Sequence, residues 1–423
     1  MSRFLLATWD GGGVVTAELA LAQELVARGH DVLVVADDTV AGDAARAGVD
    51  FRPWVRAPHA RARDRDRALV RDWETRNPFS VEANIGVQLF TGPAARFADD
   101  VADAIRDWEP DVLVIDAFLG GALAAAEASG LPFAAVAPNV NMLRAPGIPA
   151  IGGGFRPPRG PLGRLRDRAL HGLSDRMLRV RSLDGLRTGL GLPPVRTMDA
   201  MVRRADRVIL LTSAAFDFTP TEPDDQVVYG GIPEPRDDGV TWTPPWEVGT
   251  PAALVALGTT FQDQRGLLER VTTALGGVEC HALVTLGPAL AGHPPRRVPD
   301  NVHVVDEVPH GAVFPHVDVC VTHGGHGTVV RSLAAGVPVL VLPNGRDQAD
   351  NAARAVALGA GRRMAARASV DRLREAVADA LVDGPLHDAA HAVATRLAPD
   401  LGAPRAVAVL EELAARRTGR RSA

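Results

Sequence analysis

Short, nearly uninterrupted apolar runs alternate along the chain with longer stretches in which apolar residues recur every three or four positions. The short runs are typical of strands buried on both faces of a parallel sheet, and the longer stretches are typical of helices that cover it. In the first half the expected strands are residues 4–8, 31–36, 49–55, 111–116, 133–137 and 205–212. This half is therefore predicted to be a doubly wound α/β domain, with 49–55 at an edge and 205–212 as its last strand.

A proline-rich segment interrupts the alternation at residues 216–251. Because proline removes a backbone donor and favours turns, we interpret this segment as an interdomain linker with its flanks. Strand-like runs then restart at 253–257, 281–286 and 302–305. The predicted organisation is an N-terminal domain (1–220), a linker (221–250), a second Rossmann-like domain (251–390) and a helical tail (391–423). A chain of 423 residues is also long for a single core.

The most informative segment is 317–352. It reads Val-Asp-Val-Cys-Val-Thr-His-Gly-Gly-His-Gly-Thr, a helical stretch, Val-Pro-Val-Leu-Val-Leu-Pro and then Asn-Gly-Arg-Asp-Gln-Ala-Asp-Asn. A β-α-β unit is right-handed with parallel strands, so His323 and the pair Asp347 and Gln348 are expected at one sheet edge. Ligands bind at this edge of open α/β sheets. The glycine turn and helix N-terminus suit a pyrophosphate, while a carboxylate beside an amide suits sugar hydroxyls.

These residues resemble the donor signature of the GT-B glycosyltransferases. The matching positions are His323-Gly324-Gly325-His326-Gly327-Thr328, Gly336-Val337-Pro338 and Asp347-Gln348. More narrowly, they resemble the family of plant and bacterial UDP-glycosyltransferases and actinobacterial natural-product (antibiotic and macrolide) glycosyltransferases. The resemblance implies two Rossmann-like doubly wound parallel-sheet domains that face a cleft. A structural β-α-β unit whose polar residues only cap the helix is the alternative.

The resemblance assigns donor roles residue by residue. It places the diphosphate at His323, Gly325, Gly327 and Thr328, with His326 as a second imidazole, and the donor sugar at Asp347 and Gln348. The turn Gly258-Thr259-Thr260 matches the family's short turn that reaches the donor phosphate across the cleft, although a plain turn would fit the pattern too. Val308 lies where the family holds the nucleobase, but the usual aromatic residue before Pro309 is missing.

The expected catalytic base is altered in this chain. Inverting transfer needs a group that takes the acceptor's proton. The family supplies it with a histidine after the first strand, and that position aligns with Val14, which cannot accept a proton. Asp116 matches the aspartate that normally orients this histidine, so we predict Asp116 as the base, with Asp10 second and Glu82 and His59 as distant candidates. A helix N-cap role for Asp116 is the alternative.

Two insertions, 58–97 and 139–197, interrupt the first domain, and such long excursions are often functional. In the family these segments shape the acceptor pocket. The residues carried over as acceptor contacts are Trp73, Phe79, Phe90 and Asn139. The aromatic side chains fit ordinary core positions equally well, and the arginine runs fit a solvated helix face. The acceptor is expected to be a lipophilic natural-product aglycone, and the donor a dTDP-deoxysugar or UDP-glucose.

Composition narrows the cellular setting. The formal net charge of −5 gives no reason to expect nucleic acid or an acidic membrane as a partner. The two cysteines cannot form a disulfide framework, which fits a reducing compartment. Neither a signal peptide nor a membrane span is expected, so a cytoplasmic location is predicted. No metal or other cofactor is expected beside the nucleotide-sugar co-substrate. A homodimer and a helper protein are left open.

Three other functions compete. The turn Gly11-Gly12-Gly13, with Asp37 and Asp38 ending the second strand, would suit a dinucleotide and a dehydrogenase, but Thr16 fills the third glycine position. The loss of the family's histidine at Val14 would suit a catalytically silent binding protein. A sugar-nucleotide epimerase or hydrolase of GT-B type is the third. We predict the inverting glycosyltransferase.

Overall fold

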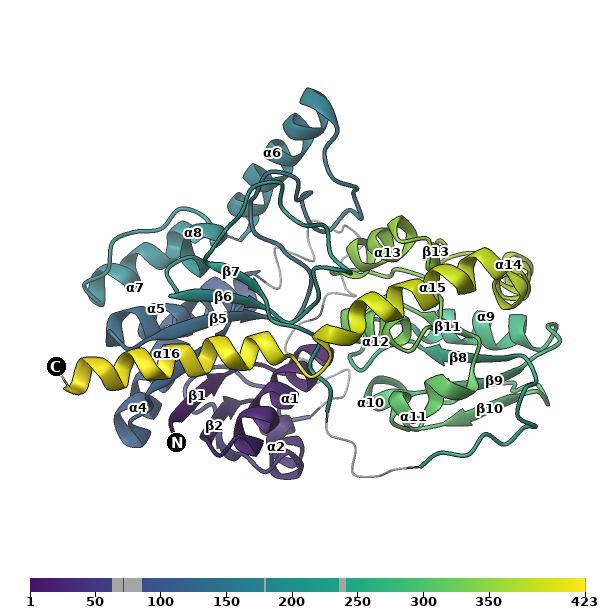
Figure 1. The fold of residues 1–423 in the computed structure, drawn as a ribbon, viewed down its shortest axis with the longest axis horizontal. Helices are drawn as coiled ribbons and strands as arrows, with labels where there is room; N and C mark the ends of the chain where they lie inside the picture. Colours follow the sequence, from purple (N-terminus) through teal and green to yellow (C-terminus); the bar gives the residue numbers. More distant parts are fainter. Residues whose placement is uncertain (63–70, 72–85, 179, 236–240, 423) are drawn as a thin grey trace.

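Two parallel sheets form the framework of the protein (Figure 1). The computed structural model describes residues 1–62, 71, 86–178, 180–235 and 241–422. The first sheet has the order β3-β2-β1-β4-β5-β6-β7 and the second β10-β9-β8-β11-β12-β13. In each sheet the first strand in the sequence lies inside the sheet and the order reverses beside it. A ligand-binding crevice is expected at this reversal, outside the carboxyl ends of the strands.

The strands have the following bounds. In the first sheet they are β1 (Arg3–Ala7), β2 (Asp31–Ala36), β3 (Asp50–Pro53), β4 (Val112–Asp116), β5 (Phe133–Ala137), β6 (Arg207–Leu210) and β7 (Val227–Tyr229). In the second they are β8 (Ala252–Ala256), β9 (His281–Thr285), β10 (Val302–Val305), β11 (Val319–Thr322), β12 (Val339–Val341) and β13 (Gly361–Arg363). The predicted edge position of the third strand is confirmed.

The helices have the following bounds. In the first domain they are α1 (Gly13–Ala27), α2 (Ala41–Ala47), α4 (Ala94–Trp108), α5 (Gly120–Ser129), α6 (Gly160–Met177), α7 (Asp184–Gly189) and α8 (Met198–Val202). The later helices are α9 (Arg265–Leu275), α10 (Gly287–Leu290), α11 (His310–Val313), α12 (His326–Ala334), α13 (Gln348–Ala357), α14 (Val370–Val382), α15 (Gly384–Leu397) and α16 (Pro404–Ser422). No helix in the described part of the chain is long and apolar enough to cross a membrane.

Apolar residues cover both faces of each sheet. Leu5 belongs to one core cluster, whereas its neighbours Phe4 and Leu6 belong to the cluster on the opposite face. This alternation follows from the pleat of the strand, and it explains why β1 is apolar without interruption. The central strands β4, β5 and β8 are buried at every residue. The apolar runs therefore correctly predicted a sheet covered on both faces.

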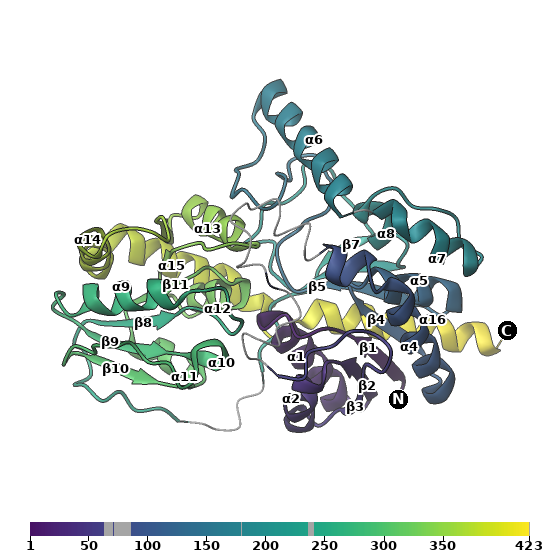
Figure 2. The same ribbon diagram turned by 180° about the vertical axis from the view of Figure 1, so that it is seen from behind.

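Two segments extend the first domain beyond the sequence expectation. The first sheet does not end at residues 205–212, because β7 pairs in parallel with β6 and lies inside the predicted linker. Only three residues form β7, and the flanking prolines hide so short a run in the sequence. The C-terminal helix α16 crosses back from the second domain and packs on the first sheet (Figures 1 and 2). Val407 and Leu410 are fully buried there.

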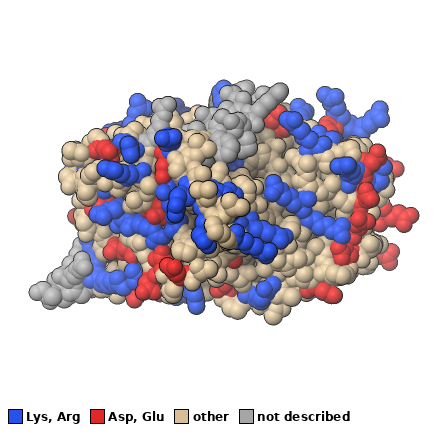
Figure 3. All heavy atoms as spheres, turned by 90° about the horizontal axis from the view of Figure 1, so that it is seen from above, with Lys and Arg blue, Asp and Glu red and all other residues tan. Residues whose placement is uncertain are grey.

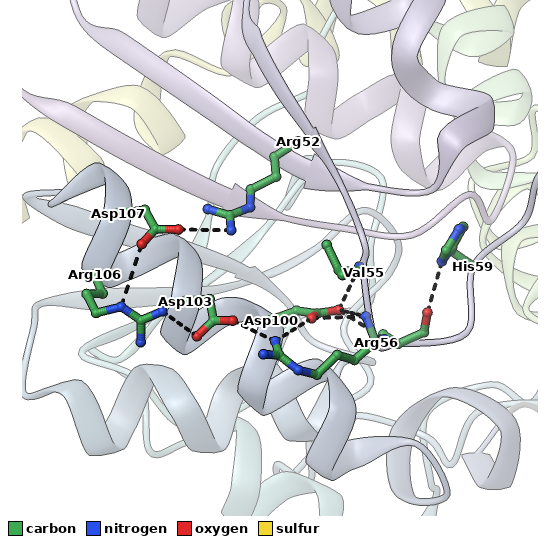
Figure 4. A network of polar contacts seen from close by, with 9 residues as sticks. Arg52, Val55, Arg56, His59, Asp100, Asp103, Arg106 and Asp107 are labelled. Carbon is green, nitrogen blue, oxygen red and sulfur yellow. Dashed lines mark hydrogen bonds and ion pairs between the residues drawn. The ribbon is translucent and has the colours of Figure 1, made fainter.

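The first insertion is anchored at its start. Asp100 of α4 accepts hydrogen bonds from the backbone N–H groups of Val55, Arg56 and Ala57 at 2.9 Å each. The Arg56 guanidinium also pairs with Asp103 at 2.6 Å (Figure 4). Three N–H groups on one buried carboxylate fix the direction in which the chain leaves β3. The insertion therefore starts from a rigid point beside the sheet.

The second insertion carries α6, which projects from the body of the protein (Figures 1 and 2). Basic side chains gather across the middle of the face that contains this helix (Figure 3). Arg164 and Arg168 of α6 are exposed, as a solvated helix face requires. Residues in the second half of α6 turn towards the space between the domains, where they border the cavity described next.

Candidate active site

A cavity of about 660 Å³ lies between the two domains. Trp9, Val14 and Asn139 line it from the first domain, and His323 and Asp347 line it from the second. The domains approach closely beside it. A Cβ atom on Gly12 would overlap the Thr259 hydroxyl and lie 2.7 Å from the Thr260 methyl carbon. The two domains are therefore in close contact beside the cavity.

His323 follows β11 and is held between two glycines. A Cβ atom on either Gly258 or Gly325 would lie 3.0 Å from the imidazole, so a side chain at either position would press on the ring. Gly258 also has φ +109°, a backbone conformation that favours glycine. The ring Nδ1 lies 3.5 Å from the Ala256 carbonyl oxygen. Burial lowers the pKa of His323 to about 4, and an anion bound beside the ring would raise it.

The N-terminus of α12 opens onto the same cavity. His326, Gly327 and Thr328 all line it, and the first-turn backbone N–H groups of a helix have no partner within the helix. The helix dipole adds a partial positive charge at this end. Burial lowers the pKa of His326, whose Nδ1 lies 3.3 Å from the Asn351 side-chain oxygen. These groups form a cradle for an anion.

The predicted turn at 258–260 faces this cradle, and all three of its residues line the cavity. Arg346 lies beside it and donates from Nη1 to the Thr260 hydroxyl at 3.1 Å. Arg346 also lines the cavity, and it adds a cation that the sequence analysis missed. Its position directly before Asp347, in Asn-Gly-Arg-Asp, could have indicated from the sequence that Arg346 lies at the same site.

Asp347 and Gln348 lie at the start of α13, and their side chains differ in their hydrogen bonds within the protein. Asp347 accepts a hydrogen bond from Asn351 Nδ2 at 2.9 Å. The Gln348 side chain is 2% exposed and is used within the protein. Its Oε1 accepts from the Asn344 N–H at 2.7 Å, and its Nε2 donates to Gln262 Oε1 at 2.6 Å. A sugar that contacts Gln348 must therefore compete with these bonds, whereas Asp347 lies nearer the open space.

At the predicted nucleobase end, Val308 lines the cavity together with His310 and Arg331. The His310 Nε2 lies 3.0 Å from the Thr285 hydroxyl, and burial lowers the pKa of this histidine to about 4. Burial also lowers the pKa of Arg331, against the opposing effect of Glu234. Arg331 was missed because it sits within the helical run of α12 and has no motif of its own.

The acceptor side of the cavity is largely apolar. Its lining residues from the first domain include Phe118, Met142, Leu143, Ala150, Ile151, Leu170, Leu178 and Met198. Asn139 lines the cavity as predicted. Phe90 does not, because it is fully buried in the core and packs against Gly120. Its assignment as an acceptor contact is therefore wrong in this structure. Trp73 and Phe79, like Glu82, lie outside the described residues.

Neither predicted base lines the cavity. Asp116 is 1% exposed and accepts from the Phe118 N–H at 2.7 Å. Burial raises the pKa of Asp116 to about 7. Burial, and then the charge of Asp116, raises the pKa of Glu18 on α1. Glu18 was missed, although a glutamate within the apolar positions of α1 was a signal. Asp10 accepts from the Thr39 hydroxyl at 2.6 Å.

A polar cluster lies at the acceptor end. His171 and Asp175 of α6 line the cavity with Arg144 and Asp199. Arg144 donates from Nη2 to Asp175 and, at 3.1 Å, to the His171 carbonyl oxygen. Burial, and then Arg144, lowers the pKa of His171, so its imidazole is neutral at pH 7. This cluster was not predicted from the sequence, because its members are far apart along the chain.

The first turn does not fit a dinucleotide. Asp37 would have to bind a ribose, but its carboxylate accepts from the backbone N–H groups of Asp10, at 2.8 Å, and Ala60, at 2.5 Å. It is 2% exposed. Gly12 faces the second domain at close range. His59 pairs with Asp38 at 3.5 Å and is another residue of this region that does not border the cavity.

Known proteins match the chain along nearly its whole length. Residues 269–414 match the family described as "Erythromycin biosynthesis protein CIII-like, C-terminal domain". The chain is 31% identical to 4'-demethylrebeccamycin synthase of Lentzea aerocolonigenes over 398 residues, which are 91% of this chain and 92% of that protein. The chain belongs to the GT-B family of natural-product glycosyltransferases. It is therefore a transferase, as predicted from the donor signature.

Solved structures of glycosyltransferases share the fold. The glycotransferase of kitacinnamycin superposes with a TM-score of 0.76 at 23% identity, covering 97% of this chain and 98% of that one. The glycosyltransferase VinC, in complex with dTDP, superposes with a TM-score of 0.70 at 19% identity, covering 98% of this chain and 100% of that one. The predicted GT-B architecture is thus confirmed.

Proposed function

We propose that this glycosyltransferase moves a sugar from a nucleoside-diphosphate sugar to a lipophilic small-molecule aglycone, with inversion at the anomeric carbon. One observation carries the proposal: a single cavity joins the His323 cradle to an apolar pocket. Because the anion site and the apolar pocket share one cavity, they would hold a charged donor and a lipophilic acceptor side by side. Their proximity replaces a bimolecular encounter in water.

The donor belongs to the second domain in this proposal, and the acceptor to the first. His323, Gly325, Gly327, Thr328 and the turn at 258–260 hold the diphosphate, with His326 beside them. Asp347 holds the sugar together with Gln348, and the backbone of Val308 holds the nucleobase. The dTDP in VinC supports a dTDP-sugar, and UDP-glucose remains the second donor.

The developing charge on the leaving diphosphate is met by fixed groups of this chain. They are the His323 imidazole, the α12 N-terminus and Arg346, all of which border the cavity. Preorganised donors in a buried site need no reorganisation as charge develops. The proposed mechanism therefore gives no step to a metal ion. The contact of Gly12 with the turn at 258–260 would exclude water from the donor.

The acceptor's proton has three candidate destinations. Asp116 remains the predicted base, and its pKa of about 7 suits proton transfer at neutral pH. Asp116 does not line the cavity, however, so neighbouring side chains must move before it can touch an acceptor. His171 already borders the acceptor space as a neutral imidazole. Asp10 ranks below both, since its carboxylate holds the first turn.

The proposed setting is the cytoplasm, with a nucleotide sugar and a small apolar molecule as partners. The net charge of −5 gives nucleic acids and acidic membranes no electrostatic attraction to the protein as a whole. We keep the predicted division into domains, but we extend the N-terminal domain through β7. Size-exclusion chromatography with light scattering would show whether the protein forms a homodimer.

Two measurements test the function. Calorimetry with dTDP, UDP and a panel of their sugars should show binding, and transfer to apolar aromatic acceptors should release the nucleoside diphosphate. If nucleotides bind but no acceptor is glycosylated, a catalytically silent binding protein is favoured. If the sugar nucleotide is consumed without an acceptor, the hydrolase alternative is favoured. If no sugar nucleotide binds, the proposal is wrong.

A further inference from the structure

One helix of the second domain is hydrogen-bonded directly to the loop that follows β5, which lines the predicted acceptor pocket. Helix α13 begins at the Asp347–Gln348 pair, and Asp350 follows on its first turn. The Asp350 carboxylate is 1% exposed and accepts two backbone N–H bonds from the loop that follows β5. Gly152 donates at 2.6 Å and Gly154 at 3.0 Å.

A second contact follows one turn along α13. Arg354 donates from Nε to Asp217 at 2.5 Å, and both side chains are at least 98% buried. The other Asp217 oxygen accepts from the Asn141 N–H at 2.6 Å. Arg354 also lies 4.6 Å from the centre of the Phe218 ring. The Asp217–Arg354 pair therefore connects α13 to two segments of the first domain. One is the loop after β5, through Asn141, and the other is the segment after β6, which contains Asp217.

The backbone conformation of the loop supports a fitted contact. Gly154 has φ +64°, and a Cβ atom there would lie 2.5 Å from the Ala349 carbonyl oxygen of the donor domain. A side chain at this position would push the loop away from α13. Between Asn141 and Gly154, the loop supplies several of the cavity's acceptor-side residues, among them Met142, Leu143, Arg144, Ala150 and Ile151.

We propose that Asp350 and Arg354 are positioning residues that couple the donor-sugar site to the acceptor pocket. Occupation of the Asp347–Gln348 end of α13 fixes the helix, and the fixed helix holds the loop 139–154 in the shape that receives the acceptor. This inference rests on the proposed function. The coupling is reciprocal, so an acceptor must tighten donor binding by the factor by which the donor tightens acceptor binding.

The polar character of the contact supports a coupling role. Buried ion pairs lose hydration, and apolar residues of the same size often hold two surfaces together as well or better. Hydrogen bonds between charged and backbone groups, in contrast, demand one geometry. The Asp350 and Arg354 contacts therefore fix the loop in one register, which apolar packing alone would leave less defined.

Hydrogen exchange on the full-length protein tests the contact itself. In the wild type, the amides of Gly152 and Gly154 should be protected, and saturating UDP-glucose or a dTDP-sugar, whose sugar reaches Asp347 and Gln348 in the proposed function, should slow their exchange further. Asp350→Asn should speed their exchange about 10-fold and remove the nucleotide effect. The matched control is Asp371→Asn on α14, whose carboxylate is 86% exposed and should leave both unchanged. Unchanged exchange in Asp350→Asn would overturn the proposal.

Kinetics then separate positioning from general damage. Asp350→Asn should raise the acceptor KM about 10-fold, while the dissociation constants of dTDP and UDP in the absence of acceptor stay near wild type. Because Arg354→Gln alone would bury an unpaired Asp217, the double variant Asp217→Asn/Arg354→Gln removes the pair together. It should reproduce the KM effect. A fall in kcat with an unchanged KM would contradict coupling.

Failure of the proposed function gives a different pattern. If neither dTDP nor UDP binds the wild type, the donor assignment is wrong, and exchange at Gly152 and Gly154 in Asp350→Asn still reports on the contact. If UDP-glucose or a dTDP-sugar binds and slows exchange equally in the wild type and in Asp350→Asn, the function stands and the coupling is refuted.

Discussion

The donor and acceptor sides of the cavity differ in how their residues are arranged along the chain. The donor side is built from turns that directly follow strands, as at Gly258 after β8 and His323 after β11. The acceptor side is built from insertions whose members meet only in the folded protein, such as Arg144 and Asp175. In the proposed function, the charged donor is therefore bound by a regular framework and the apolar acceptor by segments inserted into it.

Replacing His323 tests the donor side with the largest expected effect. His323→Ala removes a buried group from the diphosphate cradle and should lower kcat by about 100- to 1,000-fold. Acceptor binding, measured by fluorescence or calorimetry, should stay near wild type. The exposed His293 provides the control, since His293→Ala should retain full activity. Normal turnover with a loss of acceptor affinity would mean that the two sides are assigned the wrong way round.

Two substitutions at the candidate bases sharpen the acceptor side. Replacing the catalytic base should lower kcat by about 100-fold, and the two variants to compare are Asp116→Asn and His171→Gln. If His171 is the base, the rise of kcat/KM with pH lies below its usual 6.5, because burial lowers this pKa, and His171→Gln abolishes the rise. If Asp116 is the base, the rise lies near pH 7 and Asp116→Asn abolishes it.

Two adjacent glycines, Gly12 and Gly13, test whether catalysis needs the close contact between the domains. Gly12 has φ +76° and would collide with the turn at 258–260 if it carried a Cβ atom, whereas Gly13 has open space around it. Gly12→Ala should therefore lower kcat by about 10- to 100-fold through misplacement of the turn. Gly13→Ala should have little effect. Equal rates for the two variants would show that closure at this point is not required.

The buried Glu18–Asp116 pair gives the smallest expected effect. The pKa of Asp116 is raised from 3.8 to about 7, so its contribution to stability is fully present below pH 3.8 and is lost as pH rises through 7. Asp116→Asn cannot lose a proton. Its apparent Tm relative to wild type should therefore increase by about 2–4 °C between pH 5 and pH 8. A difference that is constant with pH would show that Asp116 is ionised in the folded protein.

The sequence by itself determined the two sheets and most of the donor side. Apolar runs fix buried parallel strands, and in such sheets the residue after a strand must lie at the ligand edge. His323 and Asp347 could therefore be placed without the fold, from local patterns alone. Even the edge position of the third strand was predicted correctly from the sequence.

The tertiary structure decided what depends on distant partners. Phe90 belongs to the core because Gly120 leaves room for it, and Asp116 is 1% exposed and does not border the cavity. Likewise, α16 returns to the first sheet and Asp350 meets Gly152 across nearly 200 residues of sequence. A local pattern records which face of an element is apolar, but it does not record which remote surface that face will meet.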